Sequence, residues 1–150
     1  MRYTILFSIF LFAILSGCHK DKFNTTPSLK FTSVNTTELR SGQLLRFTLN
    51  FTDAEGDLSD SIFVQKLVAN CPASGFNQAF PVPSFPASKD QQGELLITFG
   101  YNANTPTISY SDVVAYRCAQ NDTAVFRFAL RDKANHISDT ISSPPIIIYK

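Results

Sequence analysis

The sequence predicts an all-β fold, an antiparallel β-sandwich of about seven strands. Two segments carry the prediction, 43–52 (QLLRFTLNFT) and 123–131, because apolar residues occupy alternate positions in both. A strand with one buried face has this period of two. After residue 28 no segment shows a sustained helical period, and turn residues, not helices, separate the apolar stretches.

The first 28 residues are expected to lie outside this domain. Arg2 precedes an apolar run, Ile5–Leu15, whose length suits the core of a signal peptide and is short for a membrane span. The polar stretch His19–Ser28 then reads as a tether. The folded domain is expected at 29–150, a normal length for one core.

The end of the apolar run, LSGC, resembles the lipobox of bacterial lipoproteins. This resemblance implies cleavage before Cys18 and acylation of that residue, so that 1–17 is a signal peptide and 18–28 a lipidated tether. Several acyl chains would hold the protein stably on a membrane. The alternative is a plain secretory signal with an incidental cysteine.

Within the domain, strands are predicted at 29–34, 43–52, 61–69, 93–101 and 123–131, and the segments 137–141 and 146–149 together form the last strand. Pro144 and Pro145 separate these two segments, which suits a sheet edge or a bulge. The segments 70–92 and 102–122 are expected to be irregular, with a weak helical turn within Ser111–Ala119. Loops of this length tend to carry function or to hide an irregular edge strand.

Charge excludes one class of partner. Without Arg2 the chain has 12 basic residues against 12 acidic ones, and no basic stripe is present. Nucleic acid is therefore not an expected partner.

Cys71 and Cys118 are the cysteines left after Cys18. An exported compartment permits a disulfide, and two cysteines allow one intramolecular pairing. One distant histidine leaves too few ligands for zinc. Two free buried thiols are the alternative.

Two stretches, FTDAEGDLSD (51–60) and ALRDKANHISDT (129–140), resemble the DxDGDL and DRAGNxSN-type motifs of small lipoproteins of Bacteroidota-type bacteria. The resemblance implies an immunoglobulin-like β-sandwich, anchored by its lipid in the outer membrane of the cell envelope. Glu55 stands where those proteins usually have Asp, and Asn135 and His136 replace their Gly-Asn pair. The sequence leaves open whether the domain faces the periplasm or the cell surface.

In an immunoglobulin-like sandwich the loops 53–60 and 132–136 lie at the same pole. Four carboxylates are then expected to converge and to offer ligands for a structural calcium ion: Asp53, Glu55, Asp57 and Asp132. Calcium takes six to eight oxygen ligands, and Gly56 allows a tight bend between them. The alternative is that these acids only form Asx-type turns. No other cofactor is expected.

The long loops meet at the opposite pole, where a disulfide between them is permitted. Five aromatic residues are candidate binding residues there: Phe76, Phe80, Phe85, Tyr110 and Tyr116. Such rings stack on sugars or pack on a protein partner. The alternative is that they cover a small satellite core.

Three Asp-Ser/Thr-apolar triplets resemble O-glycan acceptor sites of the same bacterial group. The acceptors would be Ser61, Thr123 and Thr140.

The sequence predicts no enzyme. His136 is the sole histidine of the domain, and its neighbours Ser138 and Asp139 would point to opposite faces of a strand. The predicted function is a non-catalytic envelope lipoprotein that binds a glycan or a protein. The alternative is a structural or accessory subunit of an outer-membrane complex. An exposed aromatic patch would favour the former, and a long unpaired strand edge the latter.

Overall fold

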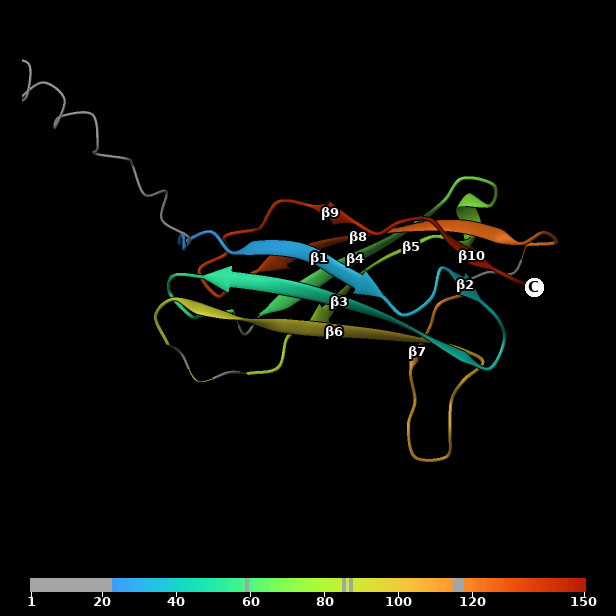
Figure 1. The fold of residues 1–150 in the computed structure, drawn as a ribbon, viewed down its shortest axis with the longest axis horizontal. Coiled ribbons are helices and arrows are strands. Elements are labelled where there is room, and N and C mark those ends of the chain that lie inside the picture. Colours follow the sequence, from blue (N-terminus) through green and yellow to red (C-terminus); the bar gives the residue numbers. More distant parts are fainter. Residues whose placement is uncertain (1–22, 59, 85, 87, 115–117) are drawn as a thin grey trace, which may run out of the picture.

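The computed structural model describes residues 23–150, except 59, 85, 87 and 115–117, and consists of two β-sheets packed face to face (Figure 1). The predicted all-β sandwich is confirmed. Among the described residues, no helix has the length and apolarity needed to cross a membrane. The lipobox and Cys18 lie outside the described residues.

The first sheet has the order β1-β3-β6-β7, and its strands are β1 (Ser28–Val34), β3 (Gln43–Asp53), β6 (Gln91–Tyr101) and β7 (Ser111–Asp112). The second has the order β2-β10-β8-β4-β5, with strands β2 (Glu38–Leu39), β10 (Ile146–Ile148), β8 (Asp122–Arg131), β4 (Ser61–Val68) and β5 (Phe76–Pro81). A further short strand, β9 (Ile141–Ser142), pairs with β8. The grouping of β1-β3-β6 against β4-β8-β10 is that of an immunoglobulin-like sandwich.

The sequence predicts an antiparallel sandwich, but the two sheets are not fully antiparallel. Two pairs are parallel, β2 with β10 and β6 with β7, and each involves a strand of two residues. All longer neighbours are antiparallel. The exceptions arise because short connecting segments run alongside a sheet edge for one or two hydrogen bonds.

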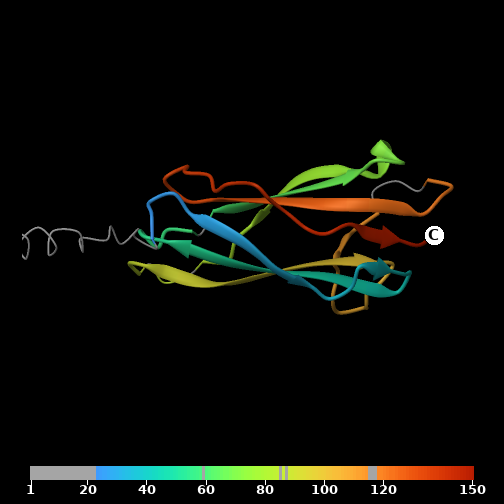
Figure 2. The ribbon, with the colours of Figure 1, turned by 45° about the horizontal axis from the view of Figure 1, so that its top comes forward.

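The alternating residues of β3 and β8 form the centre of the core, as their period predicts. The ring of Phe47 lies 4.8 Å from that of Phe126 and 5.1 Å from that of Phe128, across the two layers visible in Figure 2. The buried apolar cluster extends from Leu29 to Ile148. A chain lacking its first 18 residues therefore retains the whole described core, and we call it the anchor-free chain.

Three local expectations were wrong. The segment 70–92 is not wholly irregular: it contains β5 at the edge of the second sheet, which is the hidden edge strand left open as the alternative. The described part of 111–119 begins with β7, where a helical turn was expected. The strand expected at 137–141 is reduced to an isolated bridge between Ile137 and Arg131, followed by β9.

The sandwich has two distinct poles (Figure 1). The acidic pole is formed by the described residues of 53–60 and by the loop 132–136, beside the start of β1. The disulfide pole, at the opposite end, contains Cys71, Cys118 and the C-terminus. This is the arrangement that the immunoglobulin-like order predicts.

Candidate functional site

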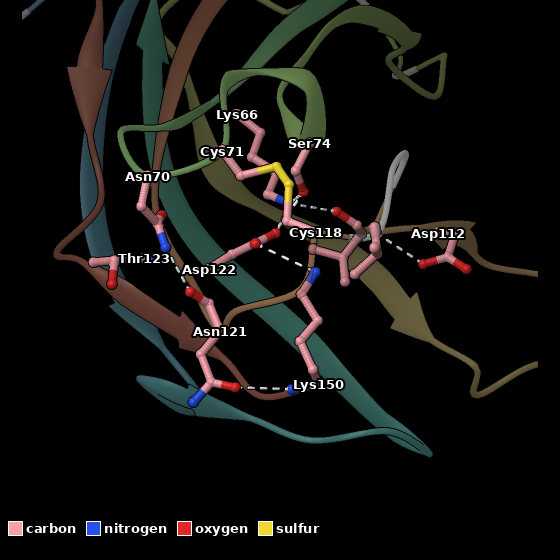
Figure 3. Close-up of polar contacts among 12 residues, drawn as sticks. Lys66, Asn70, Cys71, Ser74, Asp112, Cys118, Asn121, Asp122, Thr123 and Lys150 are labelled. Atoms are coloured by element: carbon pink, nitrogen blue, oxygen red, sulfur yellow. Dashed lines mark hydrogen bonds and ion pairs between the residues drawn. A yellow bond between two sulfur atoms is a disulfide. The ribbon is translucent and has the colours of Figure 1, made fainter.

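The predicted disulfide is present at the disulfide pole. Cys71 and Cys118 are bonded, with their Cα atoms 6.4 Å apart. The bond joins the segment after β4 to the segment before β8, so it ties the two long connections together (Figure 3).

A buried ion pair lies beside this disulfide, and sequence analysis missed it. Lys66 Nζ is 3.6 Å from Asp122 Oδ2, and both side chains are fully buried. Lys66 Nζ also donates hydrogen bonds to Ser74 Oγ at 3.0 Å and to the carbonyl of Val113 at 2.9 Å. Ser74 Oγ in turn donates to Asp122, whose second oxygen lies 3.3 Å from Lys150 Nζ (Figure 3).

The signal for this pair was in the alternation of β4. Ile62, Val64 and Val68 are buried, and Lys66 occupies the same inward row. Burial lowers the pKa of Lys66 to about 8, although the negative charge of Asp122 opposes this shift. The pair links β4, β8 and both long connections, which is a structural role.

The candidate aromatic residues do not form an exposed patch in the part of the chain that the structure describes. The rings of Phe76 and Phe80 face the core and lie 5.6 and 5.7 Å from the ring of Phe99. Tyr110 is half-buried beside Gly100. Phe85 and Tyr116 lie outside the described residues.

The acidic pole brings together three of its four predicted carboxylates. Asp53, Asp57 and Asp132 each place one oxygen within 4.8 Å of the others. Asp53 and Asp132 are fully buried and Asp57 is half-buried. Glu55 is exposed and lies outside this group. We call the three residues the acidic cluster.

Main-chain hydrogen bonds hold the acidic cluster in place. Asp53 Oδ2 accepts bonds from the amides of Gly56 at 2.6 Å and Asp57 at 3.2 Å. Asp132 Oδ1 accepts from the His136 amide at 2.7 Å, and its Oδ2 lies 2.9 Å from His136 Nδ1. Burial raises the pKa of Asp53, and the nearby charges of Asp57 and Asp132 add to this, against the two hydrogen bonds.

Gly56 is required by the bend of this loop. Its φ is +71°, and an added Cβ would lie 2.0 Å from the carbonyl oxygen of Ser88. We expect Gly56→Ala to lower the free energy of unfolding of the anchor-free chain by more than about 2 kcal/mol, from backbone strain and overlap together. Gly42→Ala is the matched control, because Gly42 has φ +85° and a Cβ added there would meet no described atom within 4 Å. Its cost should be about 1 kcal/mol, from strain alone. Equal costs in urea unfolding would contradict this interpretation.

On the outer side of β6, most of the sheet edge has no partner among the described strands. Along its whole length β6 pairs with β3, but on the other side β7 pairs only with Phe99 and Gly100. The carbonyl of Gly100 accepts a hydrogen bond from the amide of Val113 on that side. Because main-chain groups alternate in direction along a strand, those of Glu94 and Leu96 point the same way. No described strand pairs with this edge between Gly93 and Thr98.

An apolar cavity of about 190 Å³ lies beside this edge, between the two sheets. Its lining includes Ile62, Phe80, Val82, Leu95, Ile97 and Phe99. Leu96 lies next to it on the outer face, with 59% of its surface exposed. A strand added to β6 would alternate its side chains between this cavity and the outer face.

The three candidate glycan acceptors differ in accessibility. Ser61 is half-buried and donates a hydrogen bond to Asp60. Thr123 is exposed, but the Asp122 of its triplet is fully buried. Asp139 and Thr140 are both exposed on the connection before β9, so this triplet presents both polar residues to solvent.

No protein-family model and no curated protein matches the chain. Among solved structures, it is similar to the sporulation control protein Spo0M from Bacillus subtilis, with a TM-score of 0.44, 10% identity and coverage of 83% of this chain and 50% of that one. It is also similar to a Niemann-Pick type C2 protein from Japanese carpenter ant, with a TM-score of 0.44, 11% identity and coverage of 84% and 98%. A beta-glucosidase from Listeria innocua matches with a TM-score of 0.38 and 10% identity, and the chain spans 16% of its length. Similarity at this level carries no argument about function.

Proposed function

We propose that this protein is a non-catalytic, lipid-anchored component of the cell envelope that binds another protein by strand addition at the edge of β6. The observation that carries the proposal is the open edge between Gly93 and Thr98, with an apolar cavity directly beside it. Strand addition obtains affinity from main-chain hydrogen bonds and specificity from pockets for alternate side chains. The lipobox at Cys18 supplies the proposed membrane anchor.

The edge favours the accessory role over a glycan-binding one. Open sheet edges tend to be covered or blunted, because their unpaired amides and carbonyls invite another strand. The described part of this edge has no proline, and it exposes Leu96. A glycan platform would need exposed rings, whereas Phe76 and Phe80 face the core.

The polar groups near His136 support a role without catalysis. His136 Nδ1 lies against the Asp132 carboxylate. Ser138 Oγ accepts a hydrogen bond from the amide of Leu130 at 2.9 Å and donates one to the carbonyl of Asp139 at 3.0 Å. Both side chains thus hold the loop between β8 and β9.

Site-specific photocrosslinking of the full-length protein in its native envelope tests this function. A photoreactive amino acid at position 96, on the open edge, is expected to give a discrete protein adduct. The matched control is position 67, because Leu67 is also an exposed leucine, with 43% exposure, and lies on β4, which pairs with β8 at this position and with β5 up to Lys66.

The adduct should disappear when Glu94→Pro is added to the position-96 variant. Proline removes an amide that points outward, away from β3, so the sheet itself keeps its hydrogen bonds. Equal adducts from positions 96 and 67, or none from position 96, would contradict strand addition at this edge.

A further inference from the structure

The acidic cluster contains buried carboxylate oxygens for which the described residues offer no hydrogen-bond partner. Asp53 is fully buried, and its Oδ1 accepts no hydrogen bond from any described residue, although its Oδ2 accepts two. Asp57 Oδ1 is likewise buried and has no hydrogen-bond partner in the described part of the chain. Buried oxygens of this kind cost free energy unless something compensates them.

No basic side chain of the described residues forms an ion pair with Asp53 or Asp57. Among the ion pairs between described residues, the cluster has a single one, from His136 to Asp132. Three carboxylates with oxygens within 4.8 Å of one another repel each other when ionised. A cation bound among the three carboxylates would reduce this repulsion and would also be coordinated by the unpartnered oxygens.

We propose that Asp53, Asp57 and Asp132 form a binding site for a divalent cation, and that this cation is calcium. Calcium prefers carboxylate oxygens and tolerates irregular geometry, with water completing its shell. Magnesium is usually bound through one or two carboxylates and keeps several waters, so three convergent carboxylates suit it less well. Zinc prefers thiolate and imidazole ligands, and the nearby His136 imidazole is directed at Asp132.

The position of the site indicates what the ion does. The loops 53–60 and 132–136 meet here, where the amide of Lys133 donates to the carbonyl of Asp57 at 3.1 Å. The amide of Ala54 donates to the carbonyl of Asn24 at 3.0 Å, so the end of the tether is attached to the same loop. Calcium would therefore stabilise the attachment of the tether to the domain.

Thermal unfolding of the anchor-free chain with 1 mM calcium chloride or with EGTA tests the site. For an affinity of about 10 μM, calcium should raise the unfolding midpoint by about 10 °C relative to EGTA. Titration calorimetry of the wild-type chain should give one calcium ion per chain, a measurement that requires no variant.

Asp57→Asn should abolish the calcium shift while preserving the shape of the side chain. In EGTA its midpoint should equal or exceed that of the wild type, because one of three repelling charges is gone. If Asp57 only stabilised the turn, Asp57→Asn would instead lower the unfolding midpoint both with calcium and with EGTA. Glu55→Gln is the matched control, since this exposed neighbour should leave the full calcium shift.

Three results would overturn the proposal. They are the absence of a calcium shift and of calorimetric binding in the wild type, a shift retained in Asp57→Asn, and a shift lost in Glu55→Gln. An equal shift with magnesium at the same concentration would overturn the assignment to calcium. None of these outcomes depends on whether a partner binds β6, so this test and the crosslinking test fail independently.

Discussion

Lys66→Met is expected to lower the free energy of unfolding of the anchor-free chain by about 3 to 5 kcal/mol, measured in urea. Methionine has a similar length, so the change removes the charge and keeps most of the volume. It leaves Asp122 fully buried, with one cation, Lys150, near its other oxygen. The carbonyl of Val113 and the hydroxyl of Ser74 also lose a donor.

Two controls separate the ion pair from a general effect of the substitution. Lys30→Met changes an exposed lysine and should alter stability by less than about 0.5 kcal/mol. The double variant Lys66→Met/Asp122→Asn should lose less than the two single variants together, because it leaves no unpaired buried charge. Additive losses would show that the two side chains do not act as a pair.

The pH dependence of stability gives a further signature of Lys66. Burial lowers its pKa to about 8 in the folded state, whereas its ordinary value is 10.5. Between these values the unfolded chain binds more protons, so the free energy of unfolding should rise with pH across that window. The Lys66→Met variant should lack this contribution. The difference between the pH profiles of the wild type and the variant therefore measures it. Parallel profiles would contradict a buried, charged Lys66.

The sandwich could be predicted because its central strands carry one clear period. Phe47 and Phe126 lie on inward rows that the sequence shows without ambiguity, and the loop order followed from those strands. The edges could not be predicted in the same way. An edge strand needs few apolar residues and tolerates prolines, so Phe76 and Phe80 were assigned to a loop although they belong to β5.

The convergence of Asp53, Asp57 and Asp132 was also predictable, because topology alone places their loops at one pole. Glu55 could not be excluded from the sequence, since the direction of a loop side chain depends on the left-handed turn at Gly56. Lys66 was overlooked for a different reason. A lysine on an inward row contradicts the usual pattern, and its partner Asp122 is 56 positions away in the chain, counted from residue 66 to residue 122.

Removal of the disulfide, by Cys71→Ala/Cys118→Ala in the anchor-free chain, is expected to cost about 4 kcal/mol of unfolding free energy. The two cysteines are 47 residues apart, and opening a loop of that size restores chain entropy to the unfolded state. Chemical reduction of the disulfide in the wild-type chain should lower the free energy of unfolding, measured in urea, by a similar amount. A loss below about 1 kcal/mol in both experiments would contradict a stabilising bond.

The disulfide and the buried ion pair should also depend on each other. Ser74 follows Cys71 by three residues and Val113 precedes Cys118 by five, so the acceptors of Lys66 lie on the two segments that the disulfide joins. Once the bond is absent, both segments can move and the hydrogen bonds to Lys66 weaken. Adding Lys66→Met to the disulfide-free chain should therefore cost less than it does in the wild type, by about 0.5 to 3 kcal/mol. Full additivity would show that β4 and β8 hold the ion pair without help from the disulfide.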